Sequence, residues 1–314
     1  MIVKSTFLLL LALSFVATRA EARIDLSVLQ ADGYGVVDLK RPEPNVLTVT
    51  ANINGHKATL IVDTGALTEG IALESDQLRA LGAVATADRD RPATSATGKK
   101  VALKTARADR VVIGNVEISG VPLVVGSMQA LRRPTNYRSV GADGLLGAYF
   151  LRTCSAVIDL HNLRLYLRPP GHGRRVDLAP ALHAAGLAEA RIGEKCVVDV
   201  ALNDTPGKMI LDTGAFLATA DVEFAYKAGA SVAGSRVGVQ DVTGEISRTS
   251  IAHLKSFKIG GVPVRAPDLR LAKFPFYKET GGVLVGLLGI DILGSNGAII
   301  DFGQLKLYFY PAQQ

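Results

Sequence analysis

The sequence L-I-V-D-T-G-A at residues 60–66 returns almost unchanged as M-I-L-D-T-G-A at residues 209–215. Each copy is an apolar, strand-like run that ends in a carboxylate, a hydroxyl and a glycine. An ionised aspartate at the end of a buried strand is costly unless it is hydrogen-bonded or shares a proton. Two chance copies of Asp-Thr-Gly are expected in about one chain of this length in a thousand. We therefore expect Asp63 and Asp212 to lie together in the folded chain.

The repeat extends well beyond these two stretches. Residues 48–54 align with 197–203 without a gap, and both segments alternate and then turn, which predicts a hairpin whose second strand ends at the aspartate. Residues 144–167 align with 286–309, and both contain Gly-Leu-Leu-Gly, Ile-Asp and Leu-x-Leu-Tyr. The pattern predicts two similar, mostly β units related by an approximate two-fold axis.

Each unit is predicted to carry a short helix and a glycine turn. The helices are expected at residues 74–81 and 221–228, because each segment begins with an acidic residue and stops at a glycine. The turns lie at Gly98 and Gly244, between strand-like runs. The Pro- and Gly-rich residues 169–175 form a linker between the units, too short to let them move far apart.

Residues 1–22 are predicted to be a secretory signal peptide. Lys4 supplies the positive charge, residues 6–16 form an apolar run that is short for a bilayer span, and Ala20-Glu21-Ala22 is a small-x-small cleavage site. An uncleaved membrane anchor is the alternative. No later stretch is long and apolar enough to span a membrane, so we expect a periplasmic or secreted mature chain.

Composition and charge argue against several classes of function. The chain of 314 residues is 48% hydrophobic, which is ample for a packed core. Its net charge of +6 forms no basic stripe interleaved with aromatic residues, so a nucleic-acid partner is not expected. The five histidines lack the spacing of metal ligands, and the sequence has neither a Gly-x-Ser-x-Gly elbow nor a phosphate loop. We expect no metal and no cofactor.

The only two cysteines, Cys154 and Cys196, leave two alternatives open. In an oxidising compartment they can pair and join the end of the first unit to the first strand of the second. The other alternative is two buried free thiols. Sequence spacing does not decide between them.

A hydrophobic strand with Asp-Thr-Gly, followed much later by an apolar-apolar-Gly segment, resembles the aspartic peptidases, both pepsin-like and retropepsin-like. The second signal also occurs twice, at residues 144–147 and 286–289. The resemblance covers nearly the whole mature chain. It implies a mostly β fold with two acid-protease β-barrel lobes and short helices, the lobes spanning residues 23–168 and 176–314, with a cleft between them.

The resemblance also implies roles for single residues. Asp63 and Asp212 would form the catalytic pair, and two carboxylates held this close share one proton. The Thr64 and Thr213 hydroxyls would bond across the lobe interface. Gly65 and Gly214 would let backbone amides approach a carboxylate. Four leucines would form the apolar walls behind the site: Leu145, Leu146, Leu287 and Leu288.

Three features depart from the pepsin pattern. No tyrosine stands in the turns at Gly98 and Gly244, which are either flaps over the cleft or ordinary hairpins. Alanine follows each Asp-Thr-Gly, as is usual in retropepsins. Tyr149 stands where the second unit has Asp291.

The expected function is that of a secreted or periplasmic aspartic endopeptidase that acts on an extended polypeptide as a monomer. The alternative is a binding module that holds a peptide in the same cleft without cutting it. The free-energy cost of burying two carboxylates argues against that alternative, because a protein that only binds a peptide has no need of them. A homodimer with sites between chains is disfavoured by the two unequal halves and their short linker.

Overall fold

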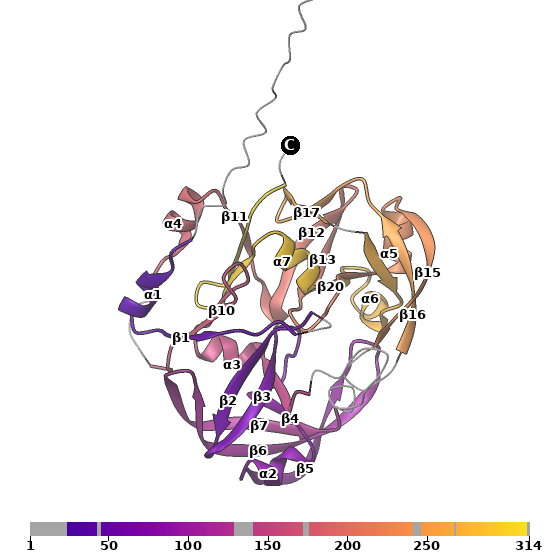
Figure 1. Cartoon of the computed structure of the whole chain (residues 1–314). Helices are drawn as coiled ribbons and strands as arrows, with labels where there is room; N and C mark the ends of the chain where they lie inside the picture. Colours follow the sequence, from indigo (N-terminus) through magenta and orange to yellow (C-terminus); the bar gives the residue numbers. More distant parts are fainter. Residues whose placement is uncertain are drawn as a thin grey trace, which may run out of the picture.

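The structure is a computed structural model that describes residues 24–42, 45–128, 141–171, 176–240, 246–266 and 268–312. It has two β lobes, with the N-terminal lobe below the C-terminal lobe in Figure 1. The prediction of a mostly β chain with two similar lobes is confirmed. The predicted boundaries stay predictions, because residues 1–22 and part of the linker 169–175 lie outside the described residues.

The N-terminal lobe is a seven-stranded sheet in the order β2-β3-β8-β4-β7-β6-β5. Its strands are β2 (Thr48–Ile53), β3 (His56–Asp63), β4 (Ile71–Glu74), β5 (Val84–Thr94), β6 (Lys100–Ile113), β7 (Val116–Gly126) and β8 (Gly144–Gly147). The end of β6 also pairs with β2, Ile113 opposite Ala51, which closes the sheet upon itself. The predicted hairpin at Asn54-Gly55 joins β2 to β3.

The C-terminal lobe repeats this order with its long strands divided. Its sheet runs β15-β16-β19-β14-β20-β13-β12-β17-β18. Its strands are β12 (Val197–Leu202), β13 (Thr205–Leu211), β14 (Thr219–Asp221), β15 (Ser231–Gln240), β16 (Ile246–His253), β17 (Phe257–Ile259), β18 (Val262–Pro263), β19 (Leu269–Ala272) and β20 (Leu284–Leu288). The pairing of β17 with β12 reproduces the pairing of β6 with β2.

A third sheet joins the lobes, in the order β1-β10-β9-β21-β22-β11. Its strands are β1 (Gly35–Asp38), β9 (Val157–Asp159), β10 (Arg164–Leu167), β11 (Ala188–Arg191), β21 (Ile299–Asp301) and β22 (Lys306–Phe309). At its centre Ile158 lies opposite Ile300, so the two Ile-Asp copies of the repeat meet there. The approximate two-fold axis predicted from the sequence therefore passes through this pair.

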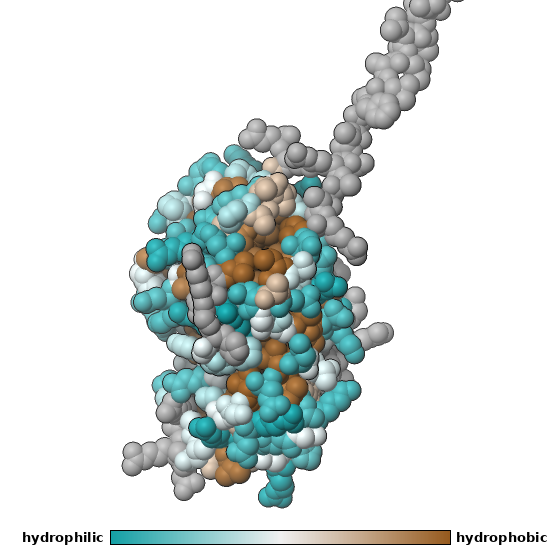
Figure 2. Space-filling view, turned by 90° about the vertical axis from the view of Figure 1, so that its left-hand side faces the viewer, coloured by the Kyte–Doolittle hydropathy of each residue, from teal (hydrophilic) through white to brown (hydrophobic). Residues whose placement is uncertain are grey.

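Short helices complete the fold. They are α1 (Ser27–Ala31), α2 (Gln77–Ala80), α3 (Ala148–Thr153), α4 (Ala179–Ala184), α5 (Val222–Lys227), α6 (Pro275–Glu279) and α7 (Ile290–Ser295), with a 3-10 turn at Glu194–Cys196. Leu29 of α1 and Leu182 of α4 pack with Tyr166 and Tyr308 of the joining sheet. Figure 2 views the side of the molecule that carries these two helices, where hydrophobic patches alternate with hydrophilic residues. None of the helices in the described ranges has the length and apolar character needed to cross a membrane.

The prediction of a helix over residues 74–81 was wrong at its start. The helix begins only at Gln77, and Glu74 is the last residue of β4. Its buried carboxylate accepts hydrogen bonds from Ser75 and Met128, which holds the chain extended instead of opening a helix. The second helix, predicted over residues 221–228, agrees better with the structure. Asp221 caps α5 by accepting a hydrogen bond from the Glu223 amide.

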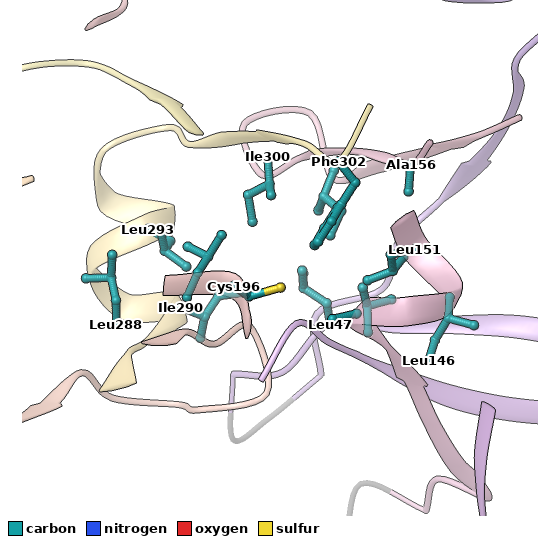
Figure 3. Close-up of a cluster of buried hydrophobic side chains, with 14 of the residues drawn as sticks. Leu47, Leu146, Leu151, Ala156, Cys196, Leu288, Ile290, Leu293, Ile300 and Phe302 are labelled. Carbon is teal, nitrogen blue, oxygen red and sulfur yellow. The ribbon is translucent and has the colours of Figure 1, made fainter. Parts of the chain in front are cut away.

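One large hydrophobic core runs through both lobes. In Figure 3 Cys196 lies between Ile290 and Leu293 of the C-terminal lobe and Leu47 and Leu151 of the N-terminal lobe. Of the two alternatives for the cysteines, the structure has two buried free thiols. Burial raises the pKa of Cys154 to about 12 and that of Cys196 to about 11. Both thiols are therefore protonated and poorly reactive at neutral pH.

Candidate active site

Asp63 and Asp212 occupy the same place in the two lobes. Asp63 is the last residue of β3, and Asp212 follows the last residue of β13. Each strand lies parallel to a Gly-Leu-Leu-containing strand, β8 or β20, so the chain leaves the sheet at the aspartate beside a buried leucine wall. The residues predicted as walls, Leu145, Leu146, Leu287 and Leu288, are all buried.

The structure brings the two aspartates together, with a hydrogen bond between their side chains. The glycine of each triplet faces the carboxylate of the other lobe. A Cβ atom at Gly65 would lie 2.5 Å from Cγ of Asp212, and one at Gly214 would lie 2.5 Å from Cγ of Asp63. Any side chain there would collide with the pair, so this approach requires glycine.

Backbone amides support each carboxylate from its own lobe. Oδ1 of Asp63 accepts hydrogen bonds from the amides of Gly65 at 2.9 Å and Ala66 at 3.0 Å. Oδ1 of Asp212 accepts the equivalent bonds from Gly214 and Ala215 at the same distances. The structure thus places two backbone amides against each carboxylate.

The two threonines cross the lobe interface, and both are fully buried. Oγ1 of Thr64 donates to the Leu211 carbonyl at 2.6 Å and accepts from the Thr213 amide at 3.0 Å. Oγ1 of Thr213 donates to the Val62 carbonyl at 2.6 Å and accepts from the Thr64 amide at 3.1 Å. These four hydrogen bonds fix one aspartate loop against the other.

Burial is the main cause of the altered acidity of the pair. It raises the pKa of Asp63 above the usual 3.8, although hydrogen bonds from Asp212 and from the Ala66 and Gly65 amides oppose the rise. The pKa of Asp212 is raised well above 3.8 by burial, by the negative charge of Asp63 and by the bond between the side chains. The pair therefore holds a proton where separate carboxylates would both be ionised, and each residue keeps part of its surface open to solvent.

An apolar cluster flanks the pair in each lobe. In the N-terminal lobe Met128, Leu145 and Val124 belong to a buried cluster against which Ala66 and, from the other lobe, Phe216 pack. In the C-terminal lobe a cluster of Phe274, Leu287 and Ala272 carries Ala215 and Phe276. The rings of Phe274 and Phe276 stack with centroids 4.6 Å apart.

The turn at Gly98 reaches from the N-terminal lobe to the C-terminal lobe. A Cβ atom at Gly98 would lie 2.8 Å from Cγ of Pro275, the first residue of α6, and Ala96 packs against the cluster that contains Phe274. Gly98 has φ +88°, a conformation that favours glycine. The second candidate flap, Gly244, lies outside the described residues.

Sequence reasoning missed several residues of this region. Met128 and Phe274 belong to the apolar clusters against which Ala66 and Ala215 pack, and Phe276 packs against the second of them. Their signal in the sequence was weak because apolar residues usually indicate ordinary core. The one weak signal is Phe274-Pro275-Phe276, because two aromatic residues this close together are unusual in a chain that is only 6% aromatic. Asp291 accepts a hydrogen bond from the Ala218 amide at 2.8 Å, while its repeat partner Tyr149 is exposed.

The comparisons with known proteins agree with this geometry. The family described as "Aspartyl protease" matches residues 49–150 and 198–292, one segment in each lobe and together more than half of the chain. Among solved structures, the chain is similar to the aspartic proteinase from Irpex lacteus, with 13% sequence identity and a TM-score of 0.53. That match covers 89% of this chain and 98% of the other, and it shows a shared fold. A search of curated proteins found no match.

The family match spans both Asp-Thr-Gly copies and both Gly-Leu-Leu-Gly segments. This chain belongs to the aspartyl protease family.

Proposed function

We propose that the chain is an aspartic endopeptidase in which Asp63 and Asp212 activate a water molecule against a peptide carbonyl. The observation that carries the proposal is the hydrogen-bonded pair itself. Two carboxylates from different lobes meet, each supported by two backbone amides and both with a raised pKa. Perturbed carboxyls at a solvent-accessible position of this kind suit general acid–base work.

The division of labour follows from the shared proton. Both carboxyls have a raised pKa, so the pair holds one proton, and the protonated carboxyl donates a hydrogen bond to the ionised one. The ionised carboxylate of the pair then takes a proton from water, whose oxygen attacks the scissile carbonyl carbon, while the protonated carboxyl polarises the carbonyl oxygen. A proton passes to the leaving nitrogen as the carbon–nitrogen bond breaks, and the pair is left with one shared proton again.

The substrate in this proposal is a polypeptide in extended form, held between the lobes. Both halves of the pair come from one chain, and four threonine hydrogen bonds fix them, so a second copy is not needed to build the site. We therefore propose a monomer. The signal-like residues 1–22 support a periplasmic or secreted location.

Casein cleavage from acid to neutral pH tests the proposal. Wild type and Asp63→Asn are compared, with and without a statine-type inhibitor. The proposal predicts cleavage by the wild type alone and its loss with the inhibitor. If both proteins are folded and neither cuts at any pH, the chain is instead a peptide-binding module, and calorimetry with unfolded casein would then detect binding without cleavage.

A further inference from the structure

An open hollow of about 410 Å³ lies on the N-terminal lobe, and its lining includes neither aspartate of the catalytic pair. Its volume is within the range of sites that hold small ligands. The hollow crosses three neighbouring strands, β7, β6 and β5, and reaches the loop between β3 and β4. Its polar lining is Glu69, Thr86, Thr105 and Arg107, and its apolar lining includes Pro122 and Val124. The hollow therefore combines two opposite charges and two hydroxyls with an apolar surface.

Two glycines bring the opposite charges to the same strand, β7. Gly70 has φ +75°, and a Cβ there would lie 1.8 Å from the Pro122 carbonyl oxygen, so glycine is required for the loop that carries Glu69 to lie this close to β7. Gly120 has φ +64°, and a Cβ there would lie 2.1 Å from Nη2 of Arg107. The guanidinium of Arg107 therefore lies over the backbone at Gly120, two residues before Pro122. Both charged residues thus border the hollow at one short segment of β7.

A β-bulge supplies the two hydroxyls of the hollow. Between Ala85 and Ala87 the pairing of β5 with β6 shifts register, which makes Thr86 an extra residue in β5. The Thr86 hydroxyl donates a hydrogen bond to Oγ1 of Thr105 at 3.2 Å. Among the residues that the structure describes, the hydrogen of the Thr105 hydroxyl has no acceptor of its own. It is therefore available to a ligand in the hollow.

Arg107 is the second donor that faces a ligand. It is two residues after Thr105 in β6, so the two side chains leave the same face of the sheet. Within the described part of the chain Arg107 forms no ion pair, whereas Arg110 of the same strand pairs with Glu117 at 2.6 Å. A guanidinium beside a hydroxyl hydrogen suits a carboxylate. The negative charge of Glu69 disfavours ligands with several negative charges and favours one that also carries an ammonium group.

We propose that this hollow is a second binding site, which takes a free α-amino acid with an apolar side chain. Arg107 and the Thr105 hydroxyl bind its carboxylate, and Glu69 binds its ammonium group. Its side chain packs on Pro122 and Val124, which lie opposite Arg107 and Thr105 in the pairing of β6 with β7. The C-terminal residue of a peptide shares the carboxylate but has an amide nitrogen in place of the ammonium, so Glu69 favours the free amino acid.

Titration of the full chain with four ligands, followed by NMR, tests the chemistry of the site. Leucine carries both charges, N-acetylleucine only the carboxylate, leucinamide only the ammonium and N-acetylleucinamide neither. We expect leucine to bind with a Kd of about 1 mM or below, N-acetylleucine about tenfold more weakly, and the two amides more weakly still. Equal binding of leucine and N-acetylleucine would contradict the free amino acid and identify a peptide C-terminus as the occupant. If neither binds, or if either amide binds as tightly as leucine, the inference is overturned.

Single variants assign the charges of the ligand to residues of the hollow. Arg107→Gln should weaken leucine and N-acetylleucine about tenfold or more, and Thr105→Val, which keeps the shape of threonine, should weaken both by a smaller factor. Glu69→Gln should weaken leucine to the level of N-acetylleucine and leave N-acetylleucine unchanged. Arg110→Gln is the matched control on the same strand and should change neither Kd. Unchanged binding of both ligands in Arg107→Gln and Thr105→Val would contradict the inference.

The same spectra locate the bound amino acid. We expect the largest shifts at the backbone amides of Thr86, Thr105 and Arg107. The amides of Gly65 and Gly214, beside the aspartates, should not shift. Shifts confined to those two glycines would place leucine in the active site as a product and would overturn the inference. The result does not depend on peptide cleavage, because a chain that cuts nothing can still bind leucine in the hollow, and an active peptidase can fail to bind it.

Discussion

Replacing Thr64 by valine is the sharpest test of how the lobes are held together. Valine keeps the shape of threonine and removes only Oγ1. In the fully buried interface this leaves the Leu211 carbonyl and the Thr213 amide without the partner they have in the native protein. An unsatisfied buried group costs about 1–3 kcal/mol, so Thr64→Val is expected to lose about 2–6 kcal/mol of unfolding free energy.

The symmetry of the interface makes this prediction more demanding. Thr213→Val removes the other two hydrogen bonds, those to the Val62 carbonyl and from the Thr64 amide. The two variants share no lost bond, so each should lose a similar amount, but the two threonines belong to one hydrogen-bond network, so the loss in the double variant should differ from the sum of the single losses. Thr64→Ser keeps the hydroxyl and is the matched control, with a much smaller loss expected.

Urea unfolding followed by circular dichroism measures these changes through the transition midpoint. A loss of less than about 1 kcal/mol in Thr64→Val, or a loss in Thr64→Ser as large as in Thr64→Val, would refute the reasoning. Either result would mean that the four hydrogen bonds do not carry the contact between the aspartate loops.

Three further predictions concern the pair and the hairpin at Gly98. Burial raises the pKa of Asp212 above its usual 3.8, so the native state keeps a proton that the unfolded chain releases, and the stability gained in this way is present below pH 3.8 and is lost as pH rises through the folded pKa. Asp212→Asn should therefore be more stable than wild type at neutral pH in thermal melts. An equal or lower Tm would contradict this. Gly65→Ala places a Cβ 2.5 Å from Cγ of Asp212, so peptide cleavage should fall about 10²-fold or more while the fold remains, and activity within threefold of wild type would argue against the contact. A Cβ at Gly98 would lie 3.5 Å from Cβ of Pro275, which is within the range of a disulfide. The oxidised double variant Gly98→Cys/Pro275→Cys should therefore lose peptide cleavage and regain it on reduction. If mass spectrometry detects the disulfide and the variant is fully active, the hairpin need not move.

Much of the fold follows from the repeated sequence. The doubled Asp-Thr-Gly stretch and the gap-free match of residues 144–167 with 286–309 predict two equivalent lobes, because equal patterns of alternation and turns build equal strands. The repeat indicated an approximate two-fold axis without its position. The structure places Ile158 opposite Ile300 at the centre of the joining sheet, and the axis passes through this pair.

The contacts between segments that lie far apart in the sequence could not be predicted in the same way. Glu74 looked like a helix start because an acidic residue before a polar stretch is typical of one. Its role depends on the Met128 amide, which lies two residues beyond the end of β7 and far along the chain, and local sequence carries no signal for that bond. The same holds for Gly98, whose contact with Pro275 joins segments from different lobes.

The central claim is that Asp63 and Asp212 act as one proton-sharing pair, and the pH dependence of kcat/KM for a single peptide tests it most directly. Wild type, Asp63→Asn and Asp212→Asn are measured over the same pH range, with folding checked by circular dichroism. We predict a bell-shaped profile for the wild type, because one carboxyl of the pair must be protonated and the other ionised. In both variants we predict that kcat/KM falls about 10³-fold or more at every pH. Cleavage within tenfold of wild type in either variant would contradict the account.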